Sequence, residues 1–262
     1  MRLDDKLPAA TAFLLAHWRG GTKCAAMPEV LRPADLREAY GMQALFEHSS
    51  ASPLFGWKIA ATSKAGQAHI GVTGPLAGRI LAERVLADGA TTSLSGNAMR
   101  VAELEFAFRM GRDLAPRETV YSQDEVLAAV ESLHPAIELP DSRFVDFAAA
   151  GGVQLVADNG CAHEFVLGES TGAAWRGLDL AAFRPVARMP GRQDQEGLGA
   201  NVLGDPRIAL TWLVNELSAL GVVLKAGEVV TTGTCLVPIA ISPGDRLDGD
   251  FGALGRVAVA FS

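Results

Sequence analysis

The stretch RVAELEFAF, Arg100–Phe108, alternates in the way that is typical of a half-buried β-strand. Successive strand side chains point to opposite faces, so Leu104 and Phe106 lie on an apolar face, and Glu103 and Glu105 share the other. Two like charges that close repel each other, and burying either one is costly without a positive partner. The stretch therefore predicts either a solvent-facing strand or two carboxylates that hold a cation. On this pattern alone, the solvent-facing strand is the more frequent case.

Short apolar segments separated by Gly and Pro surround this stretch and predict a strand-rich chain. We expect strands at WKIAATS (57–63), HPAIELP (134–140), GGVQLVA (151–157), EFVLG (164–168), RPVARMP (184–190), EVVTTG (228–233) and RVAVAF (256–261). Strands outnumber helices and do not alternate regularly with them. This favours an α+β fold with rolled, antiparallel or mixed sheets over a doubly wound fold.

Helices are expected in three places. The first fifty residues read as helical, and Pro33 and Asp35 mark one helix start. A second helix is expected over SQDEVLAAVESL (122–133), where Ser122 and Glu125 form a capping box, and a third over residues 205–220, ahead of Gly221. We therefore expect an N-terminal helical segment, residues 1–50, followed by one compact unit, residues 51–262.

Composition narrows the class of protein. The chain has 262 residues, 49% of them hydrophobic, which is enough to bury a large core. The net charge of -7 argues against nucleic-acid binding, which needs a basic face. Cys24, Cys161 and Cys235 are widely spaced and predict reduced cysteines in a cytoplasmic protein. The longest uncharged run, Val229–Gly244, contains two prolines and two glycines, so no membrane span is expected.

A third carboxylate lies in another apolar strand, at Glu138 of HPAIELP. Oxygen ligands of this kind are preferred by Mg²⁺ and Mn²⁺. Residues i and i+2 of a strand lie about 6.5–7 Å apart, so Glu103 and Glu105 can reach one ion. Lys58, between Trp57 and Ile59, is a candidate partner for a substrate carboxylate, although on this pattern alone a surface lysine is the more frequent case.

Two turns carry further candidate binding residues. Asn159 lies in VADNG (156–160) and Thr234 ends TTGT (231–234). Loops that leave strands often carry binding groups. Taken singly, these short motifs have little specificity.

Taken in order, the motifs resemble a known family. GWKIAATSKAGQAHIGV (56–72), RVAELEFAF, AIELPDSR (136–143), VADNG and TTGT are similar to the 2-keto-4-pentenoate hydratase and 4-oxalocrotonate decarboxylase group of the fumarylacetoacetate hydrolase superfamily. The resemblance implies a mixed β-sandwich roll with peripheral helices that assembles as a homo-oligomer. It also implies Mg²⁺ or Mn²⁺ bound by Glu103, Glu105 and Glu138.

The resemblance further implies a catabolic lyase of aromatic compound breakdown, with its active site in residues 51–262. Its reaction would hydrate a 2-hydroxy-2,4-dienoate, or the equivalent 2-oxo-4-enoate, to a 4-hydroxy-2-oxo acid through a metal-chelated enolate. Lys58 would be catalytic and bind the substrate carboxylate, and Asn159 and Thr234 would contact substrate. Three alternatives stay open: a 4-oxalocrotonate-type decarboxylase, an acylpyruvate C–C hydrolase, and a non-catalytic partner subunit, since hydratase and decarboxylase of this group can associate.

One position departs from the family pattern. In GPLAGRIL (74–81), Leu76 stands where hydratases of the group usually carry an Asp that is a candidate proton carrier. Decarboxylases of the group tend to be apolar there. The departure leaves the expected metal step intact and puts the proton-transfer step in question.

Overall fold

The structure is a computed structural model that describes residues 2–262. Its α-helices are α1 (Leu3–Gly20), α2 (Leu36–Ala44), α3 (Lys64–His69), α4 (Gln123–Ala128), α5 (Phe147–Ala150), α6 (Gly152–Ala157) and α7 (Pro206–Ala219). Its strands are β1 (Gly56–Ala60), β2 (Leu76–Ile80), β3 (Val85–Leu86), β4 (Thr91–Thr92), β5 (Val101–Met110), β6 (Val130–Leu139), β7 (Glu164–Leu167), β8 (Val186–Arg188), β9 (Gln195–Glu196), β10 (Val229–Thr234), β11 (Ile239–Ala240), β12 (Arg246–Asp250) and β13 (Arg256–Phe261).

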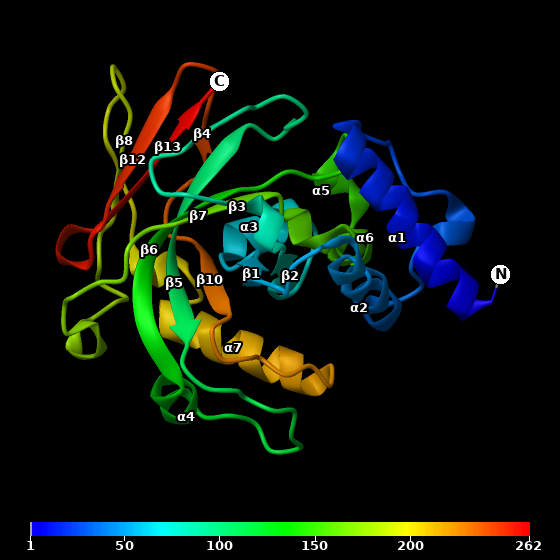
Figure 1. Cartoon of the computed structure of the whole chain (residues 1–262), viewed down its shortest axis with the longest axis horizontal. Coiled ribbons are helices and arrows are strands. Elements are labelled where there is room, and N and C mark those ends of the chain that lie inside the picture. Colours follow the sequence, from blue (N-terminus) through cyan, green and yellow to red (C-terminus); the bar gives the residue numbers. More distant parts are fainter. Residues whose placement is uncertain (1) are drawn as a thin grey trace.

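Two sheets organise these strands. The larger has the order β2-β1-β10-β5-β6-β7-β3, with β11 paired to β5, and the smaller has the order β4-β13-β12-β8-β9. Both mix parallel and antiparallel pairs: β1 runs parallel to β10, and β5 antiparallel to both β10 and β6. The long strands β5 and β6 curve through the middle of the molecule, with the smaller sheet beyond them (Figure 1). The expected α+β class with rolled mixed sheets is confirmed.

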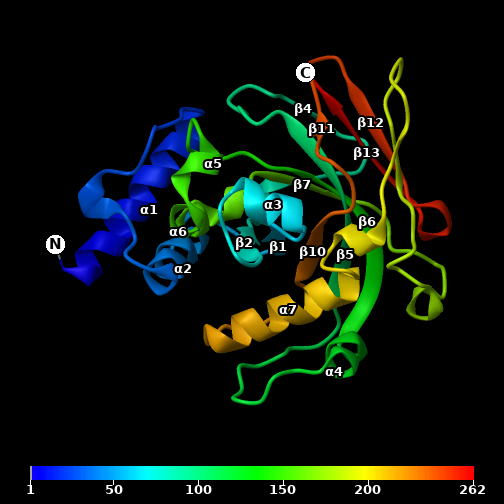
Figure 2. The same ribbon diagram turned by 180° about the vertical axis from the view of Figure 1, so that it is seen from behind.

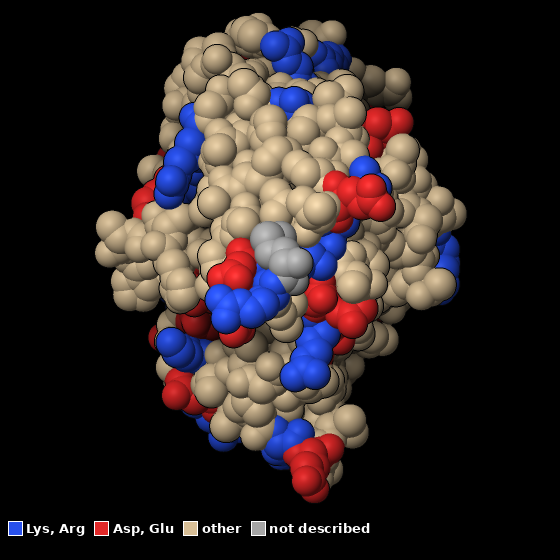
Figure 3. Space-filling view, turned by 90° about the vertical axis from the view of Figure 1, so that its right-hand side faces the viewer, with Lys and Arg blue, Asp and Glu red and all other residues tan. Residues whose placement is uncertain are grey.

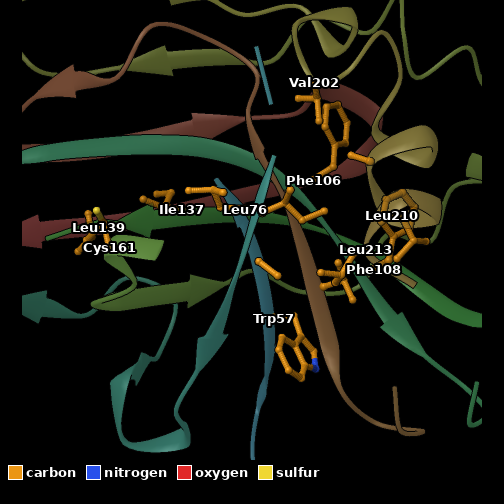
Figure 4. Packing of buried hydrophobic residues seen from close by; sticks show 14 of the residues in the cluster. Trp57, Leu76, Phe106, Phe108, Ile137, Leu139, Cys161, Val202, Leu210 and Leu213 are labelled. Atoms are coloured by element: carbon orange, nitrogen blue, oxygen red, sulfur yellow. The ribbon is translucent and has the colours of Figure 1, made fainter. Parts of the chain in front are cut away.

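Helices cover the larger sheet from two sides. The α1, α2, α5 and α6 helices gather at one end of the molecule, whereas α7 and α4 lie along another side (Figures 1 and 2). Side chains from β5 (Phe106 and Phe108) and from α7 (Leu210 and Leu213) belong to one packed layer (Figure 4). All four are fully buried, so the apolar face of Arg100–Phe108 packs into the core as its alternation predicts.

The expected helix starts and stops are confirmed. The Asp35 side chain accepts a hydrogen bond from the Glu38 backbone N–H at the start of α2. Ser122 and Glu125 form the predicted capping box of α4. Pro206 opens α7, and Gly221 follows its end in a left-handed conformation.

Two predicted elements are wrong. The helix expected over 122–133 ends at Ala128, and residues from Val130 onward form β6, where Leu133 pairs with Phe108 of β5. The strand expected at GGVQLVA is the helix α6 instead. Short apolar runs do not distinguish a buried strand from a buried helix, and in both places tertiary packing decides.

The N-terminal segment is helical as expected, and it packs closely on the rest of the chain. The buried Gln43 side chain of α2 donates to the carbonyls of Ala77 in β2 (2.8 Å) and Val156 in α6 (2.9 Å). Trp18 of α1 donates from its indole N–H to His163 Nδ1 at 2.8 Å. The division at residue 50 stays a prediction about the chain's organisation.

The surface that carries these N-terminal helices shows both signs of charge. Lys and Arg side chains alternate with Asp and Glu, and no extended patch of one sign covers this face (Figure 3). None of the helices formed by residues 2–262 has the length and apolar character that a membrane span requires.

Candidate metal and substrate site

Strand register brings the predicted carboxylates together. Glu103 of β5 lies directly opposite Glu138 of β6, and Glu105 lies opposite Ala136. Side chains of opposed residues share a face, and so do residues two apart on one strand. One ligand oxygen from each of Glu103, Glu105 and Glu138 lies within 4.8 Å of the others. Among residues 2–262, this is the one group of three or more acidic, His or Cys side chains close enough to hold a metal ion.

Each buried carboxylate of this cluster has one oxygen fixed by the protein and one that is not. Glu105 Oε2 accepts hydrogen bonds from the Thr231 hydroxyl and from the Gly233 N–H (2.7 Å). Glu138 Oε1 lies 2.9 Å from Lys58 Nζ. In the described part of the chain, Glu105 Oε1 and Glu138 Oε2 are the only buried side-chain oxygens or nitrogens without a hydrogen-bond partner. A buried oxygen without a hydrogen-bond partner destabilises the folded protein, so these two atoms indicate that a ligand binds between the carboxylates.

Lys58 reaches the cluster from the neighbouring region of the same sheet. It lies on β1, opposite Gly78 of β2 and Thr231 of β10. Its side chain is buried, and its ammonium donates to the Gly160 carbonyl at 2.9 Å in addition to pairing with Glu138. An ammonium has three donors, so these two partners leave one N–H available.

Gly78 makes room for that lysine. A Cβ atom at Gly78 would lie 2.9 Å from Lys58 Cδ and 2.5 Å from the Asn159 carbonyl oxygen. Both distances are far inside normal van der Waals contact. Only glycine at position 78 therefore leaves enough space for both the aliphatic part of the Lys58 side chain and the Asn159 carbonyl to pack against β2.

Electrostatics inside the cluster favour an added cation. Burial first, and then the charge of Glu138, raise the pKa of Glu103 to about 7. Burial and the two neighbouring carboxylates also raise the pKa of Glu105, and burial raises the pKa of Glu138. Burial lowers the pKa of Lys58, but the carboxylates, Glu138 foremost, outweigh it and hold that pKa above its ordinary value. Three carboxylates against one ammonium leave two uncompensated negative charges when all four groups are ionised, which matches the charge of one divalent ion.

The cluster therefore fits a divalent metal. Its donors are carboxylate oxygens, which hard cations prefer, and two of these oxygens are buried without a partner. The half-buried Glu103 lies at the more accessible side of the cluster, because Glu105 and Glu138 are almost fully buried. The sequence pattern that was ambiguous alone becomes an inward-facing strand face once β6 and β1 are in place.

Asn159 lies close by but its side chain is engaged elsewhere. Its amide accepts from the Arg79 N–H at 2.7 Å and donates to the Arg79 carbonyl at 2.8 Å, along the edge strand β2. The neighbouring carbonyl, that of Gly160, is the group that meets Lys58. A substrate contact by Asn159 stays a prediction, and the structure gives the residue a clear role in holding this turn.

The TTGT turn contacts the cluster through residues that sequence reasoning did not single out. Thr231 and the Gly233 N–H bind Glu105, whereas the Thr234 hydroxyl donates to the Leu236 carbonyl at 2.8 Å. Thr234 itself is paired with Glu105 across β10 and β5, beside a register shift between Thr231 and Thr234. The shift places backbone donors of the turn toward the carboxylates, a detail that the tetrapeptide alone does not reveal.

Leu76 of β2 lies on the same face of the sheet as Lys58 of β1, opposite Ala60, which is two residues from Lys58 along β1. It is paired with Ala60, as Gly78 is paired with Lys58, and alternate residues of a strand share a face. Leu76 is 6% exposed and belongs to the main apolar core. The position where hydratases of the resembling family carry an acid is therefore apolar and buried here.

Comparisons with known proteins show which proteins this chain is similar to. Residues 72–261 match the fumarylacetoacetate (FAA) hydrolase C-terminal family. A 2-keto-4-pentenoate hydratase of Paraburkholderia xenovorans (strain LB400) is 32% identical over 255 residues, covering 96% of this chain and 93% of the relative. A 2-hydroxyhexa-2,4-dienoate hydratase of Comamonas testosteroni is 36% identical over 219 residues, covering 82% of this chain and 80% of the relative.

A solved structure shares the whole fold. The 4-oxalocrotonate decarboxylase of Pseudomonas putida G7, complexed with magnesium and adipate, superposes with a TM-score of 0.89 at 24% identity. The match covers 100% of this chain and 99% of the decarboxylase. At this level of identity the likeness concerns the fold.

Proposed function

Because this chain belongs to the fumarylacetoacetate hydrolase family, we propose that it is a divalent-metal-dependent hydratase that acts on a 2-hydroxy-2,4-dienoate. The hydratases similar to it at 32% and 36% identity support the reaction class. The observation that carries the proposal is the convergence of Glu103, Glu105 and Glu138, with two orphaned oxygens, beside the ammonium of Lys58.

The metal would be held by these three carboxylates, and Mg²⁺ or Mn²⁺ suits such a donor set. A magnesium-bound structure of the decarboxylase with the same fold supports this choice. When bound, such an ion supplies Lewis acidity toward the oxygen atoms of a 2-oxo acid. Thr231 and the Gly233 N–H orient Glu105 for this task by occupying its other oxygen.

Lys58 would bind the carboxylate of the substrate. Its third N–H is not used by Glu138 or by the Gly160 carbonyl, so it can donate to an incoming anion. A fixed charge in a buried site also stabilises negative charge that develops during the reaction, because little solvent screens it. Lys58 thus both orients the acid and assists the electron flow toward its 2-oxo end.

Hydration requires two protons to end on carbon. The hydroxyl of water bonds to C4 of the dienoate, one proton comes from the 2-hydroxyl group and one from water. General acid–base transfer normally needs a positioned side chain. Leu76 supplies none, so we assign proton transfer to Lys58, whose ammonium is fixed beside Glu138.

The apolar Leu76 is the observation that favours a second candidate, a 2-oxo acid decarboxylase of the 4-oxalocrotonate type. Loss of CO₂ leaves its electron pair on the substrate and needs the same carboxylate and metal groups. Proton delivery is less demanding there, because the pair passes through the conjugated chain to the 2-oxo oxygen, where one proton gives the dienol, and no carbon must be protonated. An acylpyruvate C–C hydrolase or a non-catalytic partner subunit has no comparable observation in its favour.

The deciding experiment uses purified protein with Mg²⁺ or Mn²⁺ and two substrates in parallel. Loss of the absorbance of 2-hydroxypenta-2,4-dienoate would support the hydratase, and CO₂ release from 4-oxalocrotonate the decarboxylase. If neither substrate reacted and calorimetry showed no bound divalent metal, the enzyme proposal would be wrong and a partner subunit would be favoured. The expected cytoplasmic location and homo-oligomeric assembly stay predictions.

A further inference from the structure

A strained turn lies directly beside Lys58. Asn159, Gly160 and Cys161 follow one another with φ angles of +56°, +59° and +61°. Left-handed conformation costs an ordinary L-residue roughly 1–2 kcal/mol, and Asn tolerates it better than most residues. Strain of this kind persists only where the surroundings over-determine it. The turn carries the Gly160 carbonyl that accepts from the Lys58 ammonium.

A buried ion pair holds the start of this turn. Arg143 and Asp158 are both fully buried, and the Arg143 guanidinium pairs with the Asp158 carboxylate. The other Asp158 oxygen accepts from the Ser142 hydroxyl at 2.7 Å and from the Arg143 backbone N–H at 3.0 Å. Both oxygens of the carboxylate are therefore held by one short segment, residues 142–143.

The Arg143 guanidinium also forms hydrogen bonds with the backbone on both sides of the turn. It donates to the carbonyls of Asp158, Asp141 (2.8 Å) and Ala162 (3.0 Å). The Asp141 N–H in turn donates to the Cys161 carbonyl at 2.9 Å. These contacts bracket Asn159–Cys161 from before and after, so the planar fork of Arg143 fixes where the Gly160 carbonyl points.

We propose that Arg143 and Asp158 are positioning residues that set the direction of the free N–H of Lys58. An ammonium whose first two donors are fixed, here on Glu138 and on the Gly160 carbonyl, has the direction of its third donor fixed as well. If the Gly160 carbonyl moved away, the Lys58 ammonium would rotate and donate its free N–H to the adjacent carboxylates. The inference rests on the proposed function insofar as the third donor receives the substrate carboxylate.

Arg143→Lys tests the role of the fork. Lysine keeps the positive charge opposite Asp158, but its single ammonium cannot donate hydrogen bonds to three carbonyls and a carboxylate at the same time. We expect kcat/KM to fall about 100-fold, the loss that a misplacement of about 1 Å can cause. Calorimetric affinity for Mg²⁺ should fall far less than kcat/KM, because none of the three proposed ligands touches Arg143 and the charge of Lys58 beside them is kept.

Arg79→Lys is the matched control. Arg79 is 4% exposed, and its guanidinium pairs with Glu47 and Gln43. Only its backbone N–H and carbonyl meet the turn, at the Asn159 side chain, and the substitution leaves both in place. The substitution makes the same chemical change at a comparably buried site, so it should lower thermal stability comparably and leave kcat/KM near the wild-type value. A purely structural role for Arg143 would instead make the two variants alike in both measurements.

Hydrogen exchange at the Lys58 ammonium, measured by NMR, tests the proposal independently of activity. The protein contains five lysines, and Arg143→Lys adds a sixth, so ¹⁵N-lysine labelling gives few ammonium signals, and Lys58→Met added to each protein identifies the one from Lys58. In Arg143→Lys its hydrogens should exchange with solvent roughly fivefold faster, the effect of one hydrogen bond worth about 1 kcal/mol. Ser142→Ala keeps the ion pair and should also speed hydrogen exchange at the Lys58 ammonium, but by less. This variant tests the proposal if Arg143→Lys fails to fold.

The outcomes separate the two proposals. Unchanged exchange at Lys58 in both variants would overturn the positioning role, whatever the activity. Faster exchange in a protein that turns over neither dienoate nor 4-oxalocrotonate would support the positioning role and contradict the proposed function.

Discussion

Glu103 and Glu138 face each other directly across the β5–β6 pair, two carboxylates at opposed positions of an antiparallel ladder. Like charges in that arrangement are destabilising unless a positive charge separates them. Lys58 supplies one positive charge from β1, 2.9 Å from Glu138. The remaining imbalance is the physical reason to expect a divalent ion here.

Removing Glu105 should remove the metal and not the fold. We expect Glu105→Ala to weaken binding of Mg²⁺ or Mn²⁺ by at least about 100-fold, the upper end of what loss of even an outer-sphere partner costs. Titration calorimetry measures this directly, with circular dichroism to establish folding. Glu228→Gln is the matched control, since Glu228 is also buried but binds the Trp57 indole outside the cluster. Full metal affinity in Glu105→Ala would mean that the ligand set is wrong.

Lys58→Met should separate metal binding from turnover. The substitution removes a positive charge that lies next to the cluster and competes with a cation, so Mg²⁺ affinity should rise or stay constant. Hydration of 2-hydroxypenta-2,4-dienoate should fall by about 100-fold or more, since both orientation and charge stabilisation are lost. Metal titration and steady-state kinetics on one preparation give both numbers. A variant that kept its kcat/KM would exclude Lys58 from the reaction.

The metal-free protein should lose stability as the pH rises from about 4.3 to about 7, the pKa values of Glu103 in the unfolded and the folded chain. The pKa of Glu103, about 7 in the folded state, lies above that of a glutamate in the unfolded chain. The unfolded chain therefore releases this proton first, and stability present at low pH is lost as the pH rises through about 7. Thermal denaturation at several pH values should show the decline without metal. Glu103→Gln should lessen the decline, to which Glu105 and Glu138 with their raised pKa values also contribute, and an unchanged slope in that variant would assign the whole effect to those two groups.

Metal binding should show the opposite trend with pH. Protons compete with the ion for Glu103, so deprotonation of this carboxylate should raise the apparent Mg²⁺ affinity by up to about tenfold for each pH unit below 7, a contribution that levels off above pH 7. Calorimetry in buffers of different ionisation enthalpy would also detect the released proton. Affinity independent of pH between 5 and 8 would contradict the raised pKa.

Gly78→Ala should disturb Lys58 through space alone. The added methyl group would lie 2.5 Å from the Asn159 carbonyl oxygen and 2.9 Å from Lys58 Cδ. Overpacking of this kind typically costs about 1–3 kcal/mol of unfolding free energy, measurable by chemical denaturation. Gly74→Ala is the control, because a methyl group there would meet no atom within 4 Å. Equal stability of the two variants would show that β2 relaxes around the methyl group.

Leu76→Asp asks whether proton transfer limits the reaction. It introduces the acid that the family resemblance leads us to expect at this position, on the same side of the sheet as Lys58. We expect hydration to become at least about tenfold faster, since a positioned acid contributes 10²–10⁴-fold where proton transfer is limiting. Leu76→Asn controls for the change in polarity. An unchanged rate would mean that another group already carries the proton.

Local pattern was informative wherever the energetics are local. The alternation of Arg100–Phe108 indicates β5, and the cap residues Asp35 and Ser122 mark helix starts that the structure confirms. The pattern failed at Val130–Leu133 and at residues 151–157, because pairing with β5 and packing against α2 outweigh the intrinsic preference of a short apolar run. A sequence read alone does not contain those partners.

The sequence by itself determined which side chains are available to the site: three acids on apolar strands, a lysine on another, and a leucine in place of an acid. Only the tertiary structure decided that the acids face inward, that Thr231 and Gly233 rather than Thr234 hold Glu105, and that a strained turn meets Lys58. The physical reason is that strand alternation assigns residues to a face, whereas the partner across the sheet decides whether that face meets water, a cation or another chain segment.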